Sequence, residues 1–114
     1  MLIYLAGPMR NIKDFNFPAF FDAQYALEAQ GHKVYNPAHR DVTRCGLATF
    51  QSETGDLKDI KSGFFSLRDA MAHGLKYICE HAEAIVLLPG WEKSKGACAE
   101  KAVAEALGLQ VLYY

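Results

Sequence analysis

The chain has 114 residues, of which 51% are hydrophobic, enough to bury the core of one compact domain over residues 1–114. Its 12 basic and 13 acidic side chains give a formal net charge of −1, which gives no sign of the basic surface typical of proteins that bind nucleic acid polymers or anionic membranes. We therefore expect a small-molecule partner.

The start of the chain and its cysteines indicate where in the cell the protein is found. The N-terminus runs into a Gly-Pro turn instead of a signal-peptide cleavage region, and no stretch is apolar enough to span a bilayer. The three cysteines are far apart and have no metal-ligand spacing, so we expect reduced thiols and neither a disulfide nor a metal site. Both features predict a cytoplasmic protein.

The first part of the chain predicts a strand, a helix and a second strand. Residues 2–6 form an apolar run that ends at Gly7-Pro8, as in a buried parallel strand. Apolar positions then recur at helical spacing up to Gly31, whose place suits a C-terminal cap. Residues 32–35 read as a brief strand that ends at Asn36-Pro37.

Two connecting segments are polar. Residues 9–16 follow the first strand, where an open α/β sheet places its ligand crevice, so they form a candidate binding loop. Residues 38–63 have no sustained period, and we expect loops there with one short helical turn near residues 47–50. Because a connection this long is usually functional or mobile, we interpret it as a lid.

The second part of the chain returns to regular patterns. A helical period spans residues 64–81, an apolar strand spans 84–88, a further helix ends at Gly108, and a last strand covers 109–113. The order of elements predicts an α/β fold. We expect a small doubly wound parallel sheet, flavodoxin-like or Rossmann-like, of about four strands with helices on both faces.

Glu100 is the strongest candidate for chemistry. It lies at i of an i, i+3, i+4, i+7 stripe whose other members are Val103, Ala104 and Leu107, so its carboxylate shares the core-facing side of the helix. The structural alternative is a carboxylate at the edge of the stripe that reaches solvent or pairs with a lysine. The crevice position and the small residues before it favour a nucleophile or a base.

Ser94 and Gly96 stand at the predicted start of the same helix. Ser94 is a plausible N-cap, and its hydroxyl and the free backbone N–H groups nearby also suit an anion such as a phosphate. The segment lacks the GxxxxGK[ST] pattern, so it is not a nucleoside-triphosphate P-loop.

Three other residues have a structural and a functional interpretation. Trp91 either packs on the core or stacks on a planar ring. Asn16 either caps a helix or contacts a sugar, and Arg10 is either solvated or bound to an anion. Asp69 is most simply a solvated helix residue. The four histidines are scattered, which argues against a Ser/His/Asp arrangement.

Several segments together closely resemble a known family. IYLAGPM, DFNFPAF, NPA and above all LLPGWEKSKGACAE are similar to a family of small phage and bacterial proteins of unknown function, related to nucleoside 2-deoxyribosyltransferases and deoxynucleoside-monophosphate N-glycosidases. The resemblance implies a nucleoside or nucleotide site, no cofactor, and a homodimer or larger homo-oligomer.

The resemblance also implies roles for particular residues. Glu100 matches the glutamate that attacks the anomeric carbon in the characterised relatives. Ser94 matches the serine that binds phosphate in the nucleotide hydrolases, which favours a phosphorylated substrate. The loop that begins Gly7-Pro8-Met9-Arg10 and continues to Asn16 corresponds to the segment that wraps the sugar and base.

One departure from the family concerns the acid that helps to protonate the leaving base. The matching position, late in the third helix, is Gly74. Asp69 is five residues earlier and substitutes for that acid only if the helix shifts in register. We therefore keep two hypotheses: an enzyme that cleaves or exchanges the N-glycosidic bond of a (deoxy)nucleoside 5′-monophosphate, and a protein that binds a nucleotide without turnover.

A flavin-binding or receiver domain of the same fold is a weaker alternative. The hydroxyl-rich phosphate loop expected after the first strand is missing, and the third strand ends in Pro-Gly instead of an acceptor aspartate.

Overall fold

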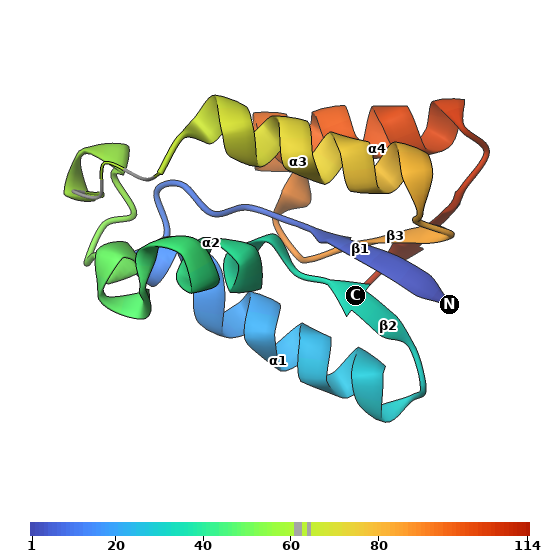
Figure 1. Ribbon diagram of the computed structural model, residues 1–114, viewed down its shortest axis with the longest axis horizontal. Coiled ribbons are helices and arrows are strands. Elements are labelled where there is room, and N and C mark those ends of the chain that lie inside the picture. Colours follow the sequence, from blue (N-terminus) through green and yellow to red (C-terminus); the bar gives the residue numbers. More distant parts are fainter. Residues whose placement is uncertain (61–62, 64) are drawn as a thin grey trace.

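A four-stranded parallel sheet forms the centre of the protein (Figure 1). The structure is a computed structural model that describes residues 1–60, 63 and 65–114. Its strands are β1 (Leu2–Ala6), β2 (Lys33–Tyr35), β3 (Ala84–Leu87) and β4 (Gln110–Tyr113), in the order β2-β1-β3-β4. All three pairings are parallel, which confirms the predicted small doubly wound α/β fold.

Helices cover both faces of the sheet. Helix α1 (Phe17–Ala29) lies on one face, and α3 (Leu67–Glu80) and α4 (Lys95–Ala106) lie on the other (Figure 1). Strand β1 alternates between them: Ile3 and Leu5 join the cluster under α1, while Tyr4 and Ala6 join the cluster under α3 and α4. This two-sided burial explains why the strand is a continuous apolar run.

Helix ends shift the predicted strand boundaries by one residue. The backbone N–H of His32 donates to Leu27 O at 3.3 Å and completes the turn that ends α1, so β2 begins at Lys33. Gly31 has φ +93° and takes the predicted capping position. The N–H of Leu109 likewise closes the end of α4, so β4 begins at Gln110.

Residues 38–60 are more regular than predicted. Helix α2 spans Pro37–Cys45, where we expected loop. Asn36 caps it by accepting a hydrogen bond from the N–H of Ala38, and Pro37 occupies the first turn. The expected helical turn is present as a 3-10 helix, η2 (Leu47–Phe50), and a second one, η3 (Leu57–Asp59), follows.

The segment after α2 is fastened to the loop after β1. Asn11 N donates to Gly55 O at 2.9 Å, and Asp14 N donates to Ser52 O at 2.6 Å. Gly55 has φ +70°, and a Cβ there would lie 2.2 Å from the Ile12 carbonyl oxygen. The predicted lid is therefore held against the binding loop by backbone contacts.

Helix α3 begins at Leu67, because the Ser66 hydroxyl accepts a hydrogen bond from Asp69 N and caps it. The predicted start at Phe64 lies outside the described residues. In α4, Leu107 is the C-terminal cap and is 49% exposed, so its predicted place on the buried stripe is wrong. No helix among the described residues is long and apolar enough to cross a membrane.

Candidate functional site

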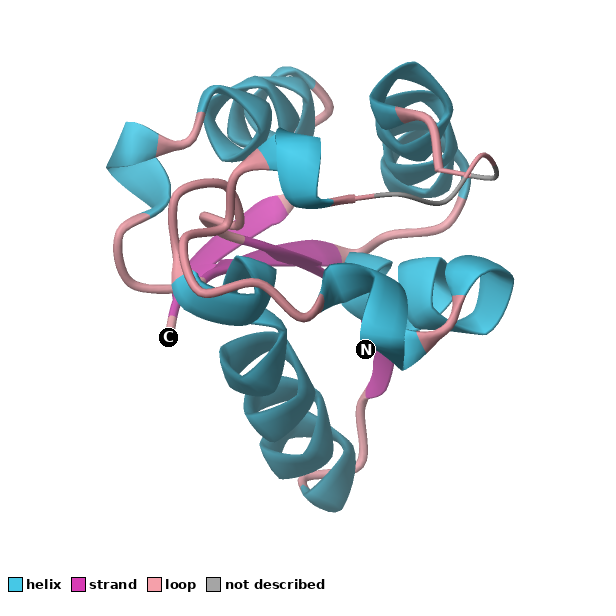
Figure 2. Ribbon diagram, turned by 90° about the vertical axis from the view of Figure 1, so that its left-hand side faces the viewer, coloured by secondary structure: helices cyan, strands magenta, loops and turns pink. Residues whose placement is uncertain are grey.

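A cavity of about 820 Å³ opens at the carboxyl ends of β1 and β3. Figure 2 looks onto this end of the sheet. The chain leaves β1 toward α1 on one face and leaves β3 toward α4 on the other, so the cavity lies at the topological switch point of the sheet. Its volume is within the range of small-molecule sites, roughly 300–1,000 Å³.

Glu100 lines the cavity from the second turn of α4. Its side chain is buried, with 9% exposed, and Oε2 accepts a hydrogen bond from the Tyr4 hydroxyl. Burial raises the pKa of Glu100 to about 7, and the hydrogen bond from Tyr4 acts in the opposite direction. The carboxyl is therefore only partly ionised near neutral pH, and its carboxylate form can act as a nucleophile or a base.

Tyr4 is a site residue that the sequence analysis missed. It is 1% exposed on β1 and stacks on Tyr35 with ring centroids 5.1 Å apart. Burial, followed by the nearby Glu100 carboxyl, raises the pKa of Tyr4 well above its usual value, so the phenol stays a hydrogen-bond donor. The available signal was a phenol in a buried apolar strand, because a buried Tyr hydroxyl needs a partner.

Gly74 of α3 packs directly over this pair. A Cβ at Gly74 would lie 2.5 Å from the Tyr4 hydroxyl oxygen and 3.3 Å from Glu100 Oε2. The space that an acidic side chain would need at this position is therefore occupied by the Tyr4 hydroxyl.

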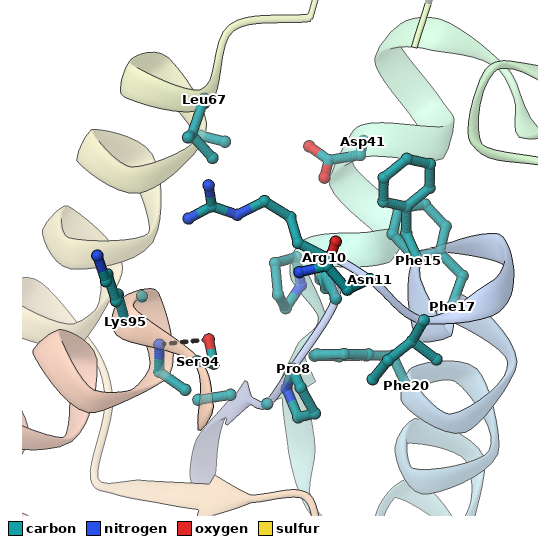
Figure 3. Close-up of a pocket in the computed structure, with 18 of the residues that line it drawn as sticks. Pro8, Arg10, Asn11, Phe15, Phe17, Phe20, Asp41, Leu67, Ser94 and Lys95 are labelled. Atoms are coloured by element: carbon teal, nitrogen blue, oxygen red, sulfur yellow. Dashed lines mark hydrogen bonds between the residues drawn. The ribbon is translucent and has the colours of Figure 1, made fainter. Parts of the chain in front are cut away.

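The anion-binding residues predicted near α4 line the cavity. Ser94 Oγ accepts a hydrogen bond from Ala97 N at 3.1 Å, which confirms the N-cap, and Gly96 lies in the first turn of the helix. A Cβ at Gly96 would lie 3.2 Å from the Met71 methyl group. Lys95 stands beside Ser94 (Figure 3). A helix N-terminus with a nearby cation favours a bound anion.

The loop after β1 contributes Gly7, Pro8, Met9 and Arg10 to the lining, as predicted. Figure 3 shows the Arg10 side chain extending across the cavity toward Leu67. Gly7 permits a close approach, because a Cβ there would lie 2.8 Å from the Leu88 Cβ.

Asn16 supports this loop from outside the cavity. Its Nδ2 donates to Pro8 O at 2.9 Å, and its backbone has φ 63° and ψ 15°. The side chain makes no capping hydrogen bond to α1 and is not part of the cavity lining. Asn16 is therefore the N-cap residue of α1 by position, as predicted, but its side chain holds the loop and does not cap the helix.

Trp91 and Asp69 lie away from the cavity lining. The Trp91 ring packs near Tyr113, with centroids 5.9 Å apart, and Lys101 Nζ lies 5.3 Å from its centre. Asp69 is half exposed and pairs with Arg40 at 2.9 Å and Arg44 at 3.7 Å. The structure thus favours the structural interpretation of each residue over its predicted place in the site: Trp91 packs between α4 and β4, and Asp69 is engaged on the surface.

Asp41 of α2 is the second acid in the cavity lining, and the sequence analysis missed it. Its side chain is buried, and Figure 3 shows the carboxylate pointing into the cavity from the side opposite Ser94 and Lys95. Burial raises the pKa of Asp41 to about 6, and Arg40 and Arg44 lower it. The sequence did carry a signal for its burial, because Asp41 shares a helical stripe at i, i+3, i+4 and i+7 with Ala38, Val42 and Cys45.

Comparisons with known proteins identify the family of the chain. No curated protein and no solved structure matches the chain. A family model matches residues 1–113, which is nearly the whole chain. The protein therefore belongs to the family described as a domain of unknown function, DUF4406.

Proposed function

We propose that this protein cleaves or transfers the N-glycosidic bond of a (deoxy)nucleoside 5′-monophosphate. The observation that supports the proposal most is the buried Glu100 carboxyl, which receives the Tyr4 hydrogen bond and has a pKa of about 7. A carboxylate that is desolvated and fixed in direction is a stronger nucleophile than one in water.

The proposed reaction is a double displacement at C1′. A Glu100 carboxylate oxygen forms a bond to C1′ while the C1′–N bond breaks and its electron pair leaves with the base. Water or a second base then attacks C1′ from the vacated side, which releases Glu100 as a carboxylate. The chemistry needs no cofactor.

The opposite end of the substrate would be held as an anion. Ser94, the free N–H groups at the start of α4, and the Arg10 and Lys95 side chains all belong to the cavity lining. Together they suit a phosphate, because the helix N-terminus supplies directed N–H groups and the two side chains supply positive charge.

The proposal includes a setting for the protein. We place it in the cytoplasm, where nucleotides are available, and its three cysteines are free as a reducing compartment requires. We also expect a homodimer or larger homo-oligomer. Exposed apolar side chains near the end of the chain, at Leu107, Leu112 and Tyr113, support such a contact.

A panel of ribo- and deoxyribonucleoside monophosphates tests the function, with free base measured by chromatography. The wild-type protein should release base from at least one of them, and Glu100→Gln should bind the same nucleotide without release. Glu105→Gln is the matched control, because Glu105 lies on the same helix but is exposed and paired with Lys101. No base release by the wild-type protein from any nucleotide would overturn the proposal.

Binding without turnover is the second candidate function. The observation that favours it is Gly74, which leaves no room for an acid beside Glu100. Calorimetric titration with the same nucleotides distinguishes the two, because a pure binding protein would show saturable heat but no free base.

A further inference from the structure

We propose that Asp41 is the acid that protonates the leaving base and later activates the attacking water or base. This assignment rests on the proposed function and names a catalytic residue for it. It moves the acid from α3 to α2, a different helix on the other side of the cavity.

The placement of Asp41 carries the proposal. Figure 3 shows its carboxylate facing the cavity on the side where Phe15, Phe17 and Phe20 lie, whereas Ser94 and Lys95 lie on the opposite side. Aromatic rings suit a planar base, and the cationic side suits a phosphate. A nucleotide oriented in this way would present its base to Asp41.

Helix α3 offers no suitable acid for this role. At position 74 the Tyr4 hydroxyl fills the space that an acidic side chain would need. The half-exposed Asp69 is paired with two arginines outside the cavity lining. Among the described residues that line the cavity, Asp41 and Glu100 are the two carboxylic acids. If Glu100 attacks C1′, Asp41 is the carboxylic acid of this lining that is left to supply the proton.

The surroundings of Asp41 keep its carboxyl group protonated in a fraction of the molecules near neutral pH. Burial raises its pKa to about 6, and the negative charge of Asp69 on α3 also raises it. Arg40 and Arg44 of its own helix lower the pKa, but Arg40 is 4.0 Å from Asp41 and donates at 2.9 Å to Asp69 instead. Asp41 helps to raise the pKa values of Tyr4 and Tyr35, so both phenols remain neutral. Arg10 is the cation that enters the cavity from the β1 loop.

The proposed step balances as follows. The Asp41 carboxylic acid gives its proton to a nitrogen or oxygen of the departing base, which receives the electron pair of the broken C1′–N bond, and Asp41 becomes a carboxylate. In the second half, that carboxylate takes a proton from the attacking water or from the N–H of an incoming base. Glu100 leaves C1′, and both acids return to their starting states.

A comparison of two leaving groups tests the role of Asp41. One substrate is the nucleotide that the wild-type protein cleaves fastest, and the other is the 4-nitrophenyl glycoside of the same sugar 5-phosphate, whose leaving group departs as a stable anion without a proton. Asp41→Asn should slow the first-turnover release of base by about 10²-fold or more, but should change the first-turnover burst of 4-nitrophenol, which reports cleavage of the C1′ bond alone, by less than about threefold. Glu100→Gln should lose both activities.

Asp22→Asn, an exposed position on α1, is the control for the change of an acid to an amide. Thermal unfolding of each variant shows that the comparison is made on folded protein. If Asp41→Asn does not fold, Asp41→Ala is measured in the same two assays, with added formate expected to restore base release.

The outcomes separate this inference from the proposed function. If the wild-type protein releases neither base nor 4-nitrophenol, the proposed function fails and this inference fails with it. If the wild-type protein is active and the Asp41 variant slows both substrates equally, or neither, only the role of Asp41 is overturned. The role of Asp41 would also be overturned if Asp69→Asn, and not Asp41→Asn, slowed base release while sparing 4-nitrophenol release.

Discussion

The Tyr4 hydroxyl donates a hydrogen bond to the Glu100 carboxylate, joining the first strand to the last helix across 96 positions of sequence. Both side chains are buried, and Gly74 packs over the contact from a third element. The hydrogen bond fixes the direction of the carboxylate and opposes the effect of burial on its pKa. Tyr4 is therefore a positioning residue for Glu100.

Removal of the Tyr4 hydroxyl should alter both the rate and its pH dependence. In Tyr4→Phe, the Glu100 carboxylate loses a donor that favours its charged form, so its pKa should rise above 7. We expect kcat to fall by up to about 10²-fold with a smaller change in KM, and the acidic limb of the pH–rate profile to move to higher pH. Tyr77→Phe, in the same aromatic cluster, should leave the limb in place; an unmoved limb in Tyr4→Phe would contradict the positioning role.

A methyl group at Gly74 should disturb the same contact. In Gly74→Ala, the added carbon would lie 2.5 Å from the Tyr4 hydroxyl oxygen, which cannot move freely because the Tyr4 ring is stacked and buried. We expect the free energy of unfolding to fall by about 1–3 kcal/mol despite the better helix propensity of alanine, together with loss of base release. The control Ala72→Gly, exposed on the same helix, should lose about 1 kcal/mol and keep its activity.

The charge of Glu100 should make the protein less stable as the pH rises. Burial raises its pKa from the ordinary value of 4.5 to about 7 in the folded protein, so the folded state binds more protons than the unfolded state between these values and stability falls through that window. Glu100→Gln removes this penalty and should be more stable than the wild-type protein by about 3 kcal/mol at pH 8, but not at pH 4. Urea unfolding at both pH values measures this; an equal difference at both would contradict the raised pKa.

Ser94 and Ser66 provide a matched pair of helix caps. Each hydroxyl accepts a hydrogen bond from a backbone N–H in the first turn of its helix, but Ser94 lines the cavity and Ser66 does not. Both Ser→Ala variants should lose about 0.5–2 kcal/mol of stability. Ser94→Ala alone should weaken binding of a nucleoside 5′-monophosphate relative to the nucleoside, measured by calorimetric titration; equal weakening of both ligands would argue against a phosphate at this helix start.

The assembly state is a separate prediction. Light scattering during size-exclusion chromatography should give a mass of at least twice the 12.7 kDa of one chain. Tyr113→Lys, which places a charge on the exposed apolar edge near β4, should lower that mass. A wild-type mass of one chain would show that the protein is a monomer.

Local patterns predicted much of the fold and part of the candidate site. The apolar run of β1, the cap at Ser94 and the core-facing position of Glu100 each depend on residues within two helical turns, so spacing alone reveals them. The loop residues Pro8 and Arg10 were predicted because parallel strands end at one edge of a sheet. Helix α2 carried an Asn-Pro start signal that the polar composition of the segment obscured.

Only the tertiary structure decided which side chains meet. That Tyr4 faces Glu100, that Gly74 leaves no space for an acid beside them, and that Asp41 enters the cavity depend on the strand order and on how three helices pack around it. The sequence by itself determined that a carboxylate would be buried at the mouth of a crevice, since helical periodicity is local. Its hydrogen-bond donor and its acidic partner come from distant segments, because contacts between elements are set by packing rather than by spacing along the chain.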